Sequence, residues 1–164
     1  MPPRFRSRLL AFALVALCFA CAAPTASARL DGPFPRERRA APKPTVGQRA
    51  AKIALRAVGV PYNWGGASPA SGFDCSGLVH WAYGRLGVPL PHSSYALYGL
   101  GRPVRRAALR AGDVLFFSGL GHVGIYLGRG RMVHAPQSGR SVEVVTLARS
   151  NYGLRLVAAR RIAA

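Results

Sequence analysis

One cysteine and two histidines are the residues of this chain best suited to chemistry. Cys75 stands in the segment SGFDCSGLVHWAY (71–83), directly after Asp74, which is a good N-cap for a helix over 74–87. A thiol in the first turn of a helix meets free backbone N–H groups and the positive end of the helix dipole, which favour a thiolate. The same N–H groups can stabilise an oxyanion beside the sulfur. This position favours a nucleophile over a buried structural thiol.

A nucleophilic thiol needs a base, and His122 and His134 are the candidates. His122 opens an expected strand over 122–128, and His134 lies near the end of the next one, 131–135. Adjacent antiparallel strands joined by the turn LGRGR can place these two residues side by side. One imidazole would then take the thiol proton, and the other would orient the first.

The other histidines fit a site less well, and so does a metal. His80 lies five residues after Cys75 in the same helix, more than one turn away, so we expect it to face away from the thiol. His92, in LPHSS, is expected mainly as a loop residue, with a place at the rim of the site as the alternative. A cysteine and two histidines can also bind catalytic zinc. These three lack short ligand spacing, and no carboxylate near them is an obvious base, so nucleophilic catalysis is favoured.

Three helices are expected in the first half of the chain. Thr45 and Gln48 fit a capping box for a helix over 46–58. Helices over 74–87 and, more briefly, over 93–101 follow. The apolar side chains at helical spacing are Ile53, Leu55 and Val58 in the first helix and Leu78, Val79, Ala82 and Leu86 in the second.

The second half of the chain predicts strands. Five short segments rich in β-branched or aromatic residues are separated mostly by Gly, Pro, Asn or Ser: 113–118, 122–128, 131–135, 141–147 and 154–162. Helices followed by an antiparallel meander indicate an α+β domain.

The chain is strongly basic. Its 164 residues include 23 Lys and Arg against 5 Asp and Glu, a net charge of +18. This excess predicts attraction to polyanions, and nucleic acid, anionic lipid and an anionic cell wall would all satisfy it. Codon bias toward arginine combined with solubility is the alternative explanation.

Residues 1–28 have the pattern of a secretory signal that is cleaved after about Ala28. Three arginines precede the uncharged apolar run LLAFALVALCFACAA (9–23), which is shorter than the ~20 residues of a membrane span. ASA (26–28) supplies small residues for cleavage. A lipid-accepting Cys21 is a poor alternative, because the residues before it do not match a lipoprotein box.

The exported chain would begin with a linker and continue as one domain. The segment 29–44 is rich in proline and charge and predicts an extended linker, and the domain is expected over 45–164. After signal cleavage Cys75 is the only cysteine, so the domain can form no internal disulfide.

Three segments together resemble the NlpC-type cell-wall cysteine peptidases. They are GVPYNWGGASPASGFDCSGLVHWAYGRLGVPLPHSS (59–94), RAGDVLFFSGLGHVGIYLG (110–128) and MVHAPQSG (132–139). The likeness runs from about Thr45 to the C-terminus. It implies a papain-like α+β fold, with N-terminal helices packed on a C-terminal antiparallel sheet.

The resemblance also implies roles for individual residues. It makes Cys75 the nucleophile, His122 the base and His134 the orienting residue. Beside the nucleophile and in the loop before it, three residues would hold the substrate or the oxyanion: Tyr62, Asp74 and Ser76. No cofactor and no metal is implied.

The implied reaction is hydrolysis of an amide in the peptidoglycan stem peptide, usually between γ-D-glutamate and the diamino acid. The implied partners are stem peptides and anionic wall polymers, with neither nucleic acid nor stable membrane insertion after signal cleavage. The protein would be secreted or associated with the wall. Arginines before the first strand could bind the wall polymers: Arg102, Arg105, Arg106 and Arg110. The alternatives are a thiol acyltransferase or amidase on the same scaffold, and a catalytically idle wall-binding module.

Overall fold

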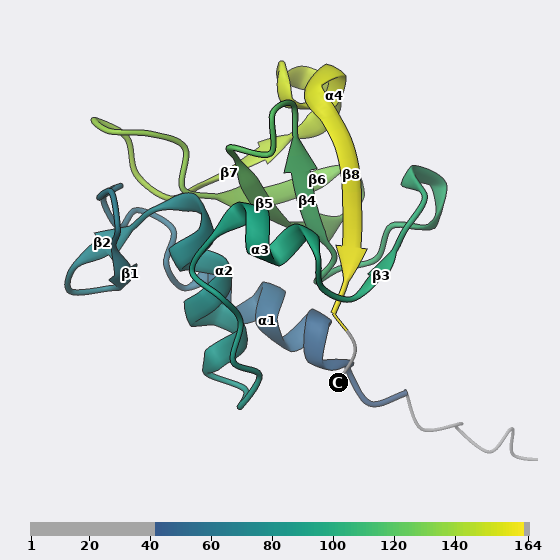
Figure 1. The fold of residues 1–164 in the computed structure, drawn as a ribbon, viewed down its shortest axis with the longest axis horizontal. Helices are drawn as coiled ribbons and strands as arrows, with labels where there is room; N and C mark the ends of the chain where they lie inside the picture. The colour runs from purple at the N-terminus through teal and green to yellow at the C-terminus, as the bar shows by residue number, and fades with distance from the viewer. Residues whose placement is uncertain (1–41, 163–164) are drawn as a thin grey trace, which may run out of the picture. The chain divides into compact units, whose positions relative to one another are not determined.

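A computed structural model describes residues 42–162 (Figure 1). The expected signal over 1–28 lies outside these residues, as does 29–41 of the expected linker. The helices are α1 (Val46–Leu55), α2 (Cys75–Gly84), α3 (Ser94–Tyr98) and α4 (Tyr152–Arg155), with short 3-10 turns η1 (Arg106–Ala108) and η2 (Leu147–Arg149). The strands are β1 (Ala67–Ser68), β2 (Gly72–Phe73), β3 (Arg102–Pro103), β4 (Val114–Phe117), β5 (Val123–Gly128), β6 (Arg131–His134), β7 (Glu143–Thr146) and β8 (Leu156–Arg161).

A six-stranded antiparallel sheet forms one layer of the domain, with the strand order β3-β8-β4-β5-β6-β7. Helices α1 and α2 contact each other and pack against β5 (Figure 1). The predicted α+β class is therefore confirmed, and β4 to β7 form the expected meander. The last strand departs from it, because β8 pairs with the free side of β4 rather than with β7. The two-residue strand β3 beside β8 was not expected from the sequence.

Strand β4 is buried on both faces and joins two clusters of apolar side chains. Val114 and Phe116 face the cluster that contains the helices, while Leu115 and Phe117 face a second cluster under η2 and α4. All four side chains are fully buried. Since side chains alternate between the faces of a strand, burial on both sides explains the unbroken apolar run VLFF.

Helix α1 is shorter than the expected 46–58, and it buries a different face. The capping box is confirmed, because the Thr45 hydroxyl accepts from the Gln48 N–H and the Gln48 side chain accepts from the Thr45 N–H. Leu55 and Val58, which have helical apolar spacing in the sequence, are 41% and 47% exposed and lie outside the core. The buried side chains are small ones: Ala50, Ala51, Ala54 and, just after the helix, Ala57. Small side chains let α1 lie close to α2.

Other elements also end earlier or start later than expected. Helix α2 covers 75–84 of the expected 74–87, and α3 covers 94–98 of 93–101. The last strand begins at Leu156, because the residues before it form α4.

The first turn of α2 lies unusually close to the loop before it. A Cβ atom on Gly77 would stand 2.0 Å from the Gly66 carbonyl oxygen and 2.9 Å from Nε2 of His92. The Gly66 carbonyl also accepts the Asp74 N–H at 3.0 Å, which fixes the loop against the helix start. Glycine at position 77 is therefore required by this contact.

We expect Gly77→Ala to destabilise the domain by about 1–3 kcal/mol, because the added methyl group displaces backbone rather than a flexible side chain. Urea denaturation measures this change. Gly84→Ala is the matched control at the other end of α2, where a Cβ meets nothing within 4 Å. The control should be neutral or stabilising by up to about 1 kcal/mol. Equal stability of both variants would contradict the proposed close contact.

Candidate active site

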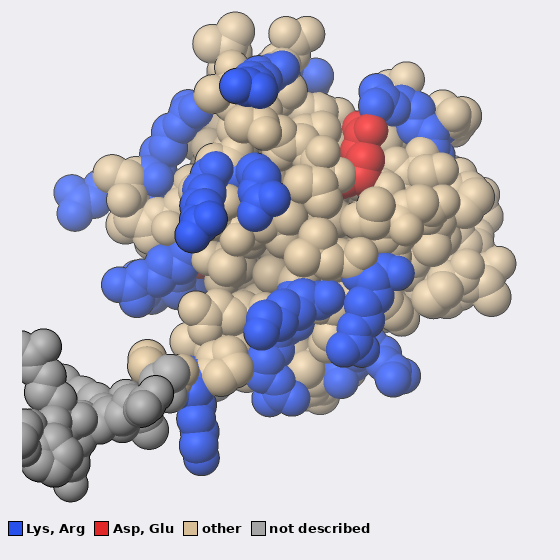
Figure 2. Space-filling view, turned by 180° about the vertical axis from the view of Figure 1, so that it is seen from behind, with Lys and Arg blue, Asp and Glu red and all other residues tan. Residues whose placement is uncertain are grey.

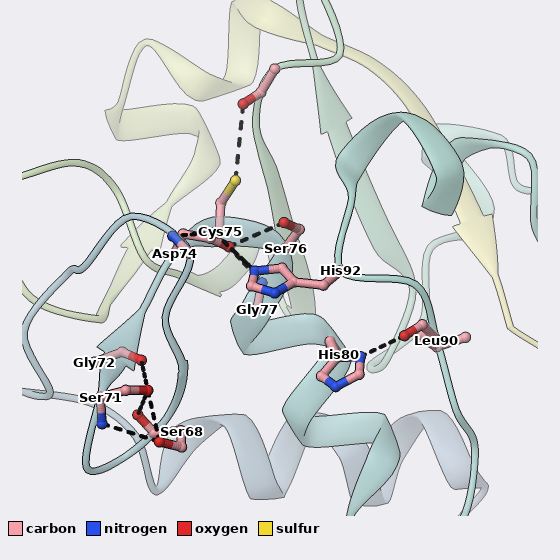
Figure 3. Close-up of polar contacts among 12 residues, drawn as sticks. Ser68, Ser71, Gly72, Asp74, Cys75, Ser76, Gly77, His80, Leu90 and His92 are labelled. Carbon is pink, nitrogen blue, oxygen red and sulfur yellow. Dashed lines mark hydrogen bonds and ion pairs between the residues drawn. The ribbon is translucent and has the colours of Figure 1, made fainter.

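The first turn of α2 brings Cys75 against the chain that leads into β5 (Figure 3). Asp74 is the N-cap of this helix, as predicted. The Cys75 Sγ lies 3.9 Å from the carbonyl oxygen of Gly121, and the backbone N–H of Val123 is directed at the sulfur. Because Gly121 and Val123 flank His122, the thiol faces the backbone around the expected base.

The thiol of Cys75 is neutral at pH 7 in this environment. Burial raises its pKa above the ordinary value, and the negative charge of Asp74 adds to the rise. Backbone N–H groups of Val123, Ser76 and Cys75 itself act in the opposite direction without outweighing the burial. The expectation of a thiolate at the helix start is wrong, because it did not include the desolvation of the sulfur.

His122 and His134 lie side by side, as predicted. His122 immediately precedes β5, and His134 ends the neighbouring strand β6. A hydrogen bond of 2.9 Å joins Nε2 of His122 to Nδ1 of His134. The second ring nitrogen of His122, Nδ1, is left for another partner. This is the order expected of a base and its orienting residue.

Aromatic rings enclose the two imidazoles. Tyr152 stacks on His122 with ring centroids 5.4 Å apart and meets His134 edge-on at 4.7 Å. Phe117 lies 5.6 Å from His122 on a tilted plane. The sequence did not point to Tyr152, because it reaches the site from α4, a short helix that replaces the start of the expected strand 154–162.

Both histidines are neutral at pH 7. Burial, together with the neighbouring His134 and Arg155, lowers the pKa of His122 to about 3. Burial likewise lowers the pKa of His134 to about 4, with a contribution from Arg140. The thiol of Cys75, which contacts the backbone on either side of His122, and the imidazole of His122 are therefore both neutral, a combination that can act by general-base transfer of the thiol proton during attack.

The carboxylate of Asp74 is the centre of a hydrogen-bond network (Figure 3). It accepts from the Gly77 N–H at 2.7 Å, the Gly65 N–H at 2.9 Å and the Ser76 hydroxyl at 3.1 Å. Nε2 of His92 donates to both carboxylate oxygens, at 2.8 and 2.9 Å. Burial acts to raise the pKa of Asp74, but these N–H donors and His92 together hold it below its usual value.

The structure brings His92 closer to the site than its sequence context suggested. Its bond to Asp74, the residue before Cys75, favours the rim position over the plain loop residue. His80 stacks on His92 with centroids 5.9 Å apart, and its Nδ1 donates to the Leu90 carbonyl at 2.5 Å. Figure 3 shows that His80 lies away from Cys75, as predicted.

Tyr62 is half-buried in the loop beside the thiol. Its N–H donates to the Arg140 carbonyl at 2.8 Å, and it forms a bridge with Phe73. Burial raises the pKa of the Tyr62 hydroxyl, and the nearby Cys75 and Asp74 raise it further. Its role in holding the substrate stays a prediction.

A carboxylate that the sequence did not reveal stands on the far side of the histidine pair. Oε1 of Glu143 lies 3.5 Å from Nε2 of His134. The two residues are paired directly across β6 and β7. The register between β6 and β7 places Glu143 opposite His134, and this register cannot be predicted from one sequence.

Acid should destabilise this protein through its two buried histidines. Their pKa values are lower in the folded state than the ~6.5 of an exposed imidazole, so the unfolded chain binds more protons below that pH. The free energy of unfolding is expected to fall between about pH 7 and about pH 5, by up to about 1.4 kcal/mol per pH unit for each histidine. Urea denaturation across this range measures the slope.

A His122→Gln/His134→Gln double variant is the control for this slope. It lacks both of these buried imidazoles, so its stability should depend much less on pH over the same range. An equal slope in the parent and in the double variant would contradict the assignment to these residues.

Comparison with known proteins is consistent with this geometry. The model of the NlpC/P60 family matches residues 59–161. A probable endopeptidase of Mycobacterium tuberculosis is 53% identical over 104 residues, which cover 62% of this chain and 27% of that protein. The murein DD-endopeptidase MepH of Escherichia coli is 37% identical over 127 residues, covering 70% and 47%. The bifunctional muramidase/DL-endopeptidase CwlT of Bacillus subtilis is 43% identical over 94 residues, covering 54% and 29%.

Solved structures show the same fold. A crystal structure of an NlpC/P60 family protein from Bacillus cereus superimposes with a TM-score of 0.68 at 35% identity, over 75% of this chain and 42% of that one. The implied papain-like arrangement of helices and antiparallel sheet is therefore confirmed. The chain spans 27% to 47% of the length of the three curated relatives. On the family match and the shared fold, the chain belongs to the NlpC/P60 family.

Proposed function

We propose that this protein is a peptidoglycan endopeptidase that hydrolyses an amide bond of the stem peptide. Cys75 is the nucleophile, His122 the base and His134 its orienting partner. The observation that carries the proposal is the hydrogen bond between His122 and His134 beside a thiol that faces the chain around His122. The endopeptidase names of the murein and peptidoglycan hydrolases similar to this chain give further support.

In the proposed reaction, the Cys75 thiol and the His122 imidazole are both neutral at the start. Nδ1 of His122 takes the thiol proton as the Cys75 sulfur bonds to the carbonyl carbon of the substrate. Backbone N–H groups at the start of α2 stabilise the oxyanion, and the Tyr62 hydroxyl is proposed to assist. The C–N bond then breaks, and His122 gives its proton to the departing amine. Water, deprotonated by His122, attacks the acyl-enzyme and releases the thiol. No cofactor takes part.

Asp74 and Ser76 support this step from the substrate side of the nucleophile. Their hydrogen bond fixes the first turn of α2, and together with Tyr62 they are proposed to hold the substrate or the oxyanion. The proposed domain organisation follows the sequence: an export signal over 1–28, a linker over 29–44 and the peptidase domain over 45–164. The protein is then secreted or held at the wall. No helix within residues 42–162 is long and apolar enough to cross a membrane.

The bond between γ-D-glutamate and the diamino acid is the proposed target. Similar proteins are named for both DL- and DD-endopeptidase activity, so the bond needs a direct test. Mass spectrometry of purified sacculi after digestion separates the two. Cleavage at γ-D-glutamate leaves disaccharide-dipeptides and a new amino terminus on the diamino acid. Cleavage at a DD bond instead splits cross-linked dimers into monomers with intact stems, and it would overturn the proposed bond.

The alternatives on this scaffold are an acyltransferase or amidase and an idle wall-binding module. Digestion in water enriched in ¹⁸O distinguishes hydrolysis, which places one label in the new carboxylate, from transfer to an amine, which places none. An amidase would release the whole stem peptide from the glycan. An idle module would bind sacculi and release no fragment.

The surface suits an anionic polymer of the cell wall as a second partner. Each of the three acidic side chains in residues 42–162 is engaged by a basic one: Asp74 by His92, Asp113 by Arg161 and Glu143 by Arg140. Figure 2 shows Lys and Arg side chains over much of one face, with little acidic surface among them. The arginines expected to bind the wall are all exposed: Arg102, Arg105, Arg106 and Arg110. Nucleic acid is not a proposed partner.

Substitutions at the proposed triad should have unequal effects on turnover. We expect Cys75→Ser and His122→Ala to leave almost no peptide cleavage, because one lacks the nucleophile and the other the base. His134→Asn should retain measurable activity, since a misaligned imidazole still accepts protons part of the time. Rates on a soluble stem peptide, with circular dichroism to check folding, measure this order. Full activity of Cys75→Ser, or a greater loss at His134 than at His122, would contradict the assigned roles.

Salt should weaken wall binding more than catalysis. The Debye length shrinks from ~10 Å at 0.1 M to ~3 Å at 1 M, so contacts of exposed arginines with the wall are screened. Binding to intact sacculi should therefore fall steeply over this range, while cleavage of a short stem peptide changes little. An Arg102→Gln/Arg105→Gln double variant should show a shallower salt dependence of binding. Salt-independent binding of the parent protein would show that its charge does not anchor it.

A further inference from the structure

One buried nitrogen at the site lacks a hydrogen bond. His134 is fully buried, and its Nε2 has no hydrogen-bond partner among the described residues, while its Nδ1 is bonded to His122. A buried polar atom without a partner is costly and calls for an explanation. The nearest charged group is Oε1 of Glu143, at 3.5 Å, which is an ion-pair distance rather than a hydrogen bond.

The fold directs Glu143 toward this nitrogen. His134 and Glu143 are direct partners in the antiparallel pairing of β6 and β7, so their side chains lie on the same face of the sheet. At 3.5 Å, the Glu143 carboxylate stands at the outer limit of hydrogen-bond distance from Nε2 of His134. Arg140 binds the other carboxylate oxygen, Oε2, and so limits where Glu143 can go.

Arg140 links the carboxylate of Glu143 to the loop that contains Tyr62. Its backbone carbonyl accepts the N–H of Tyr62, the residue beside the thiol. Glu143 is therefore held by the same loop that positions Tyr62. A solvent-exposed glutamate without such a partner would sample many rotamers, whereas Glu143 is only partly exposed, with a side-chain exposure of 27%.

The positions of the protons on the imidazoles of His122 and His134 decide whether His122 can act as a base. If Nε2 of His134 carries a proton toward Glu143, Nδ1 of His134 is an acceptor and receives the Nε2–H of His122. Nδ1 of His122 is then unprotonated and can take the thiol proton. In the opposite tautomer His134 donates to His122, so Nδ1 of His122 carries a hydrogen and cannot accept one.

We propose that Glu143 is a positioning residue that selects the productive tautomer of the histidine pair, completing a row Cys75–His122–His134–Glu143. The inference rests on the function proposed above. During attack the S–H bond breaks, the S–C bond forms and the proton moves to Nδ1 of His122. No proton is transferred to Glu143, whose charge only orients His134.

The test is ¹⁵N nuclear magnetic resonance of the imidazoles together with steady-state kinetics. In the parent protein at pH 7, His134 should be protonated at Nε2 and His122 at Nε2. In Glu143→Ala, the Nδ1–H tautomer of His134 should become populated, and kcat on a soluble stem peptide should fall about 10- to 100-fold with KM nearly unchanged. Glu143→Gln keeps an acceptor oxygen but loses the charge, so its kcat should lie between that of the parent protein and that of Glu143→Ala.

Val144→Ala is the matched control, because Val144 is the next residue of β7, points to the other face and is 37% exposed. It should leave tautomers and kcat unchanged. Two results would overturn the inference: an Nδ1-protonated His134 in the parent protein, or kcat values for Glu143→Ala equal to those of Val144→Ala. Should Glu143→Ala fail to fold, the ¹⁵N spectrum of the parent protein and the kcat of Glu143→Gln still test the role of Glu143. An inactive parent with the expected tautomers would refute the proposed function and leave the tautomer assignment standing.

Discussion

The carboxylate of Asp74 is the interaction on which the arrangement of this site depends. It caps α2, and in doing so it fixes the turn that carries Cys75. The same two oxygens hold the loop of Tyr62 through the Gly65 N–H and the segment before α3 through His92. Three stretches of chain therefore meet at one charged group that is 8% exposed. Their close approach needs glycine at position 77, since any side chain there would meet the opposing backbone.

The scarcity of acidic residues links the surface of the protein to its chemistry. Because the few carboxylates of residues 42–162 are engaged, positive charge dominates the surroundings of the site. Arg155 and Arg140 each disfavour a proton on the neighbouring imidazole, and this adds to the effect of burial. The basic composition that suits an anionic wall thus also keeps His122 unprotonated. One bias in composition serves both the proposed binding and the proposed base.

Much of the fold could be predicted from the sequence because its signals are local. The capping residues Thr45 and Asp74 and the alternation of helix and strand patterns depend on near neighbours along the chain. The core face of α1 could not be predicted, because alanines carry no strong apolar signal and the large residues Leu55 and Val58 are exposed. The side to which β8 adds was also inaccessible, since strand pairing is a long-range choice.

At the site, too, features that depend on near neighbours in the sequence were predicted, and features that depend on long-range contacts were not. The pairing of His122 with His134 was predicted because two strands joined by a short turn must be neighbours. Tyr152, Glu143 and the bond of His92 to Asp74 were missed, because each depends on a tertiary contact rather than on spacing. The protonation state of Cys75 was also predicted wrongly, because a helix start can be recognised in a sequence whereas desolvation cannot.

The neutral state of the resting thiol has a consequence for the durability of the protein. Peroxides and disulfides react with thiolates, so a half-buried sulfur with a raised pKa is expected to be oxidised slowly. If the protein is exported as proposed, Cys75 has no second cysteine in residues 42–162 with which to recover from a sulfenic acid. Keeping the proton on sulfur until a substrate carbonyl arrives would then protect the proposed nucleophile without a repair partner. For the same reason, small electrophiles chosen for thiolate reactivity should label Cys75 poorly, and compounds shaped like the stem peptide should label it better.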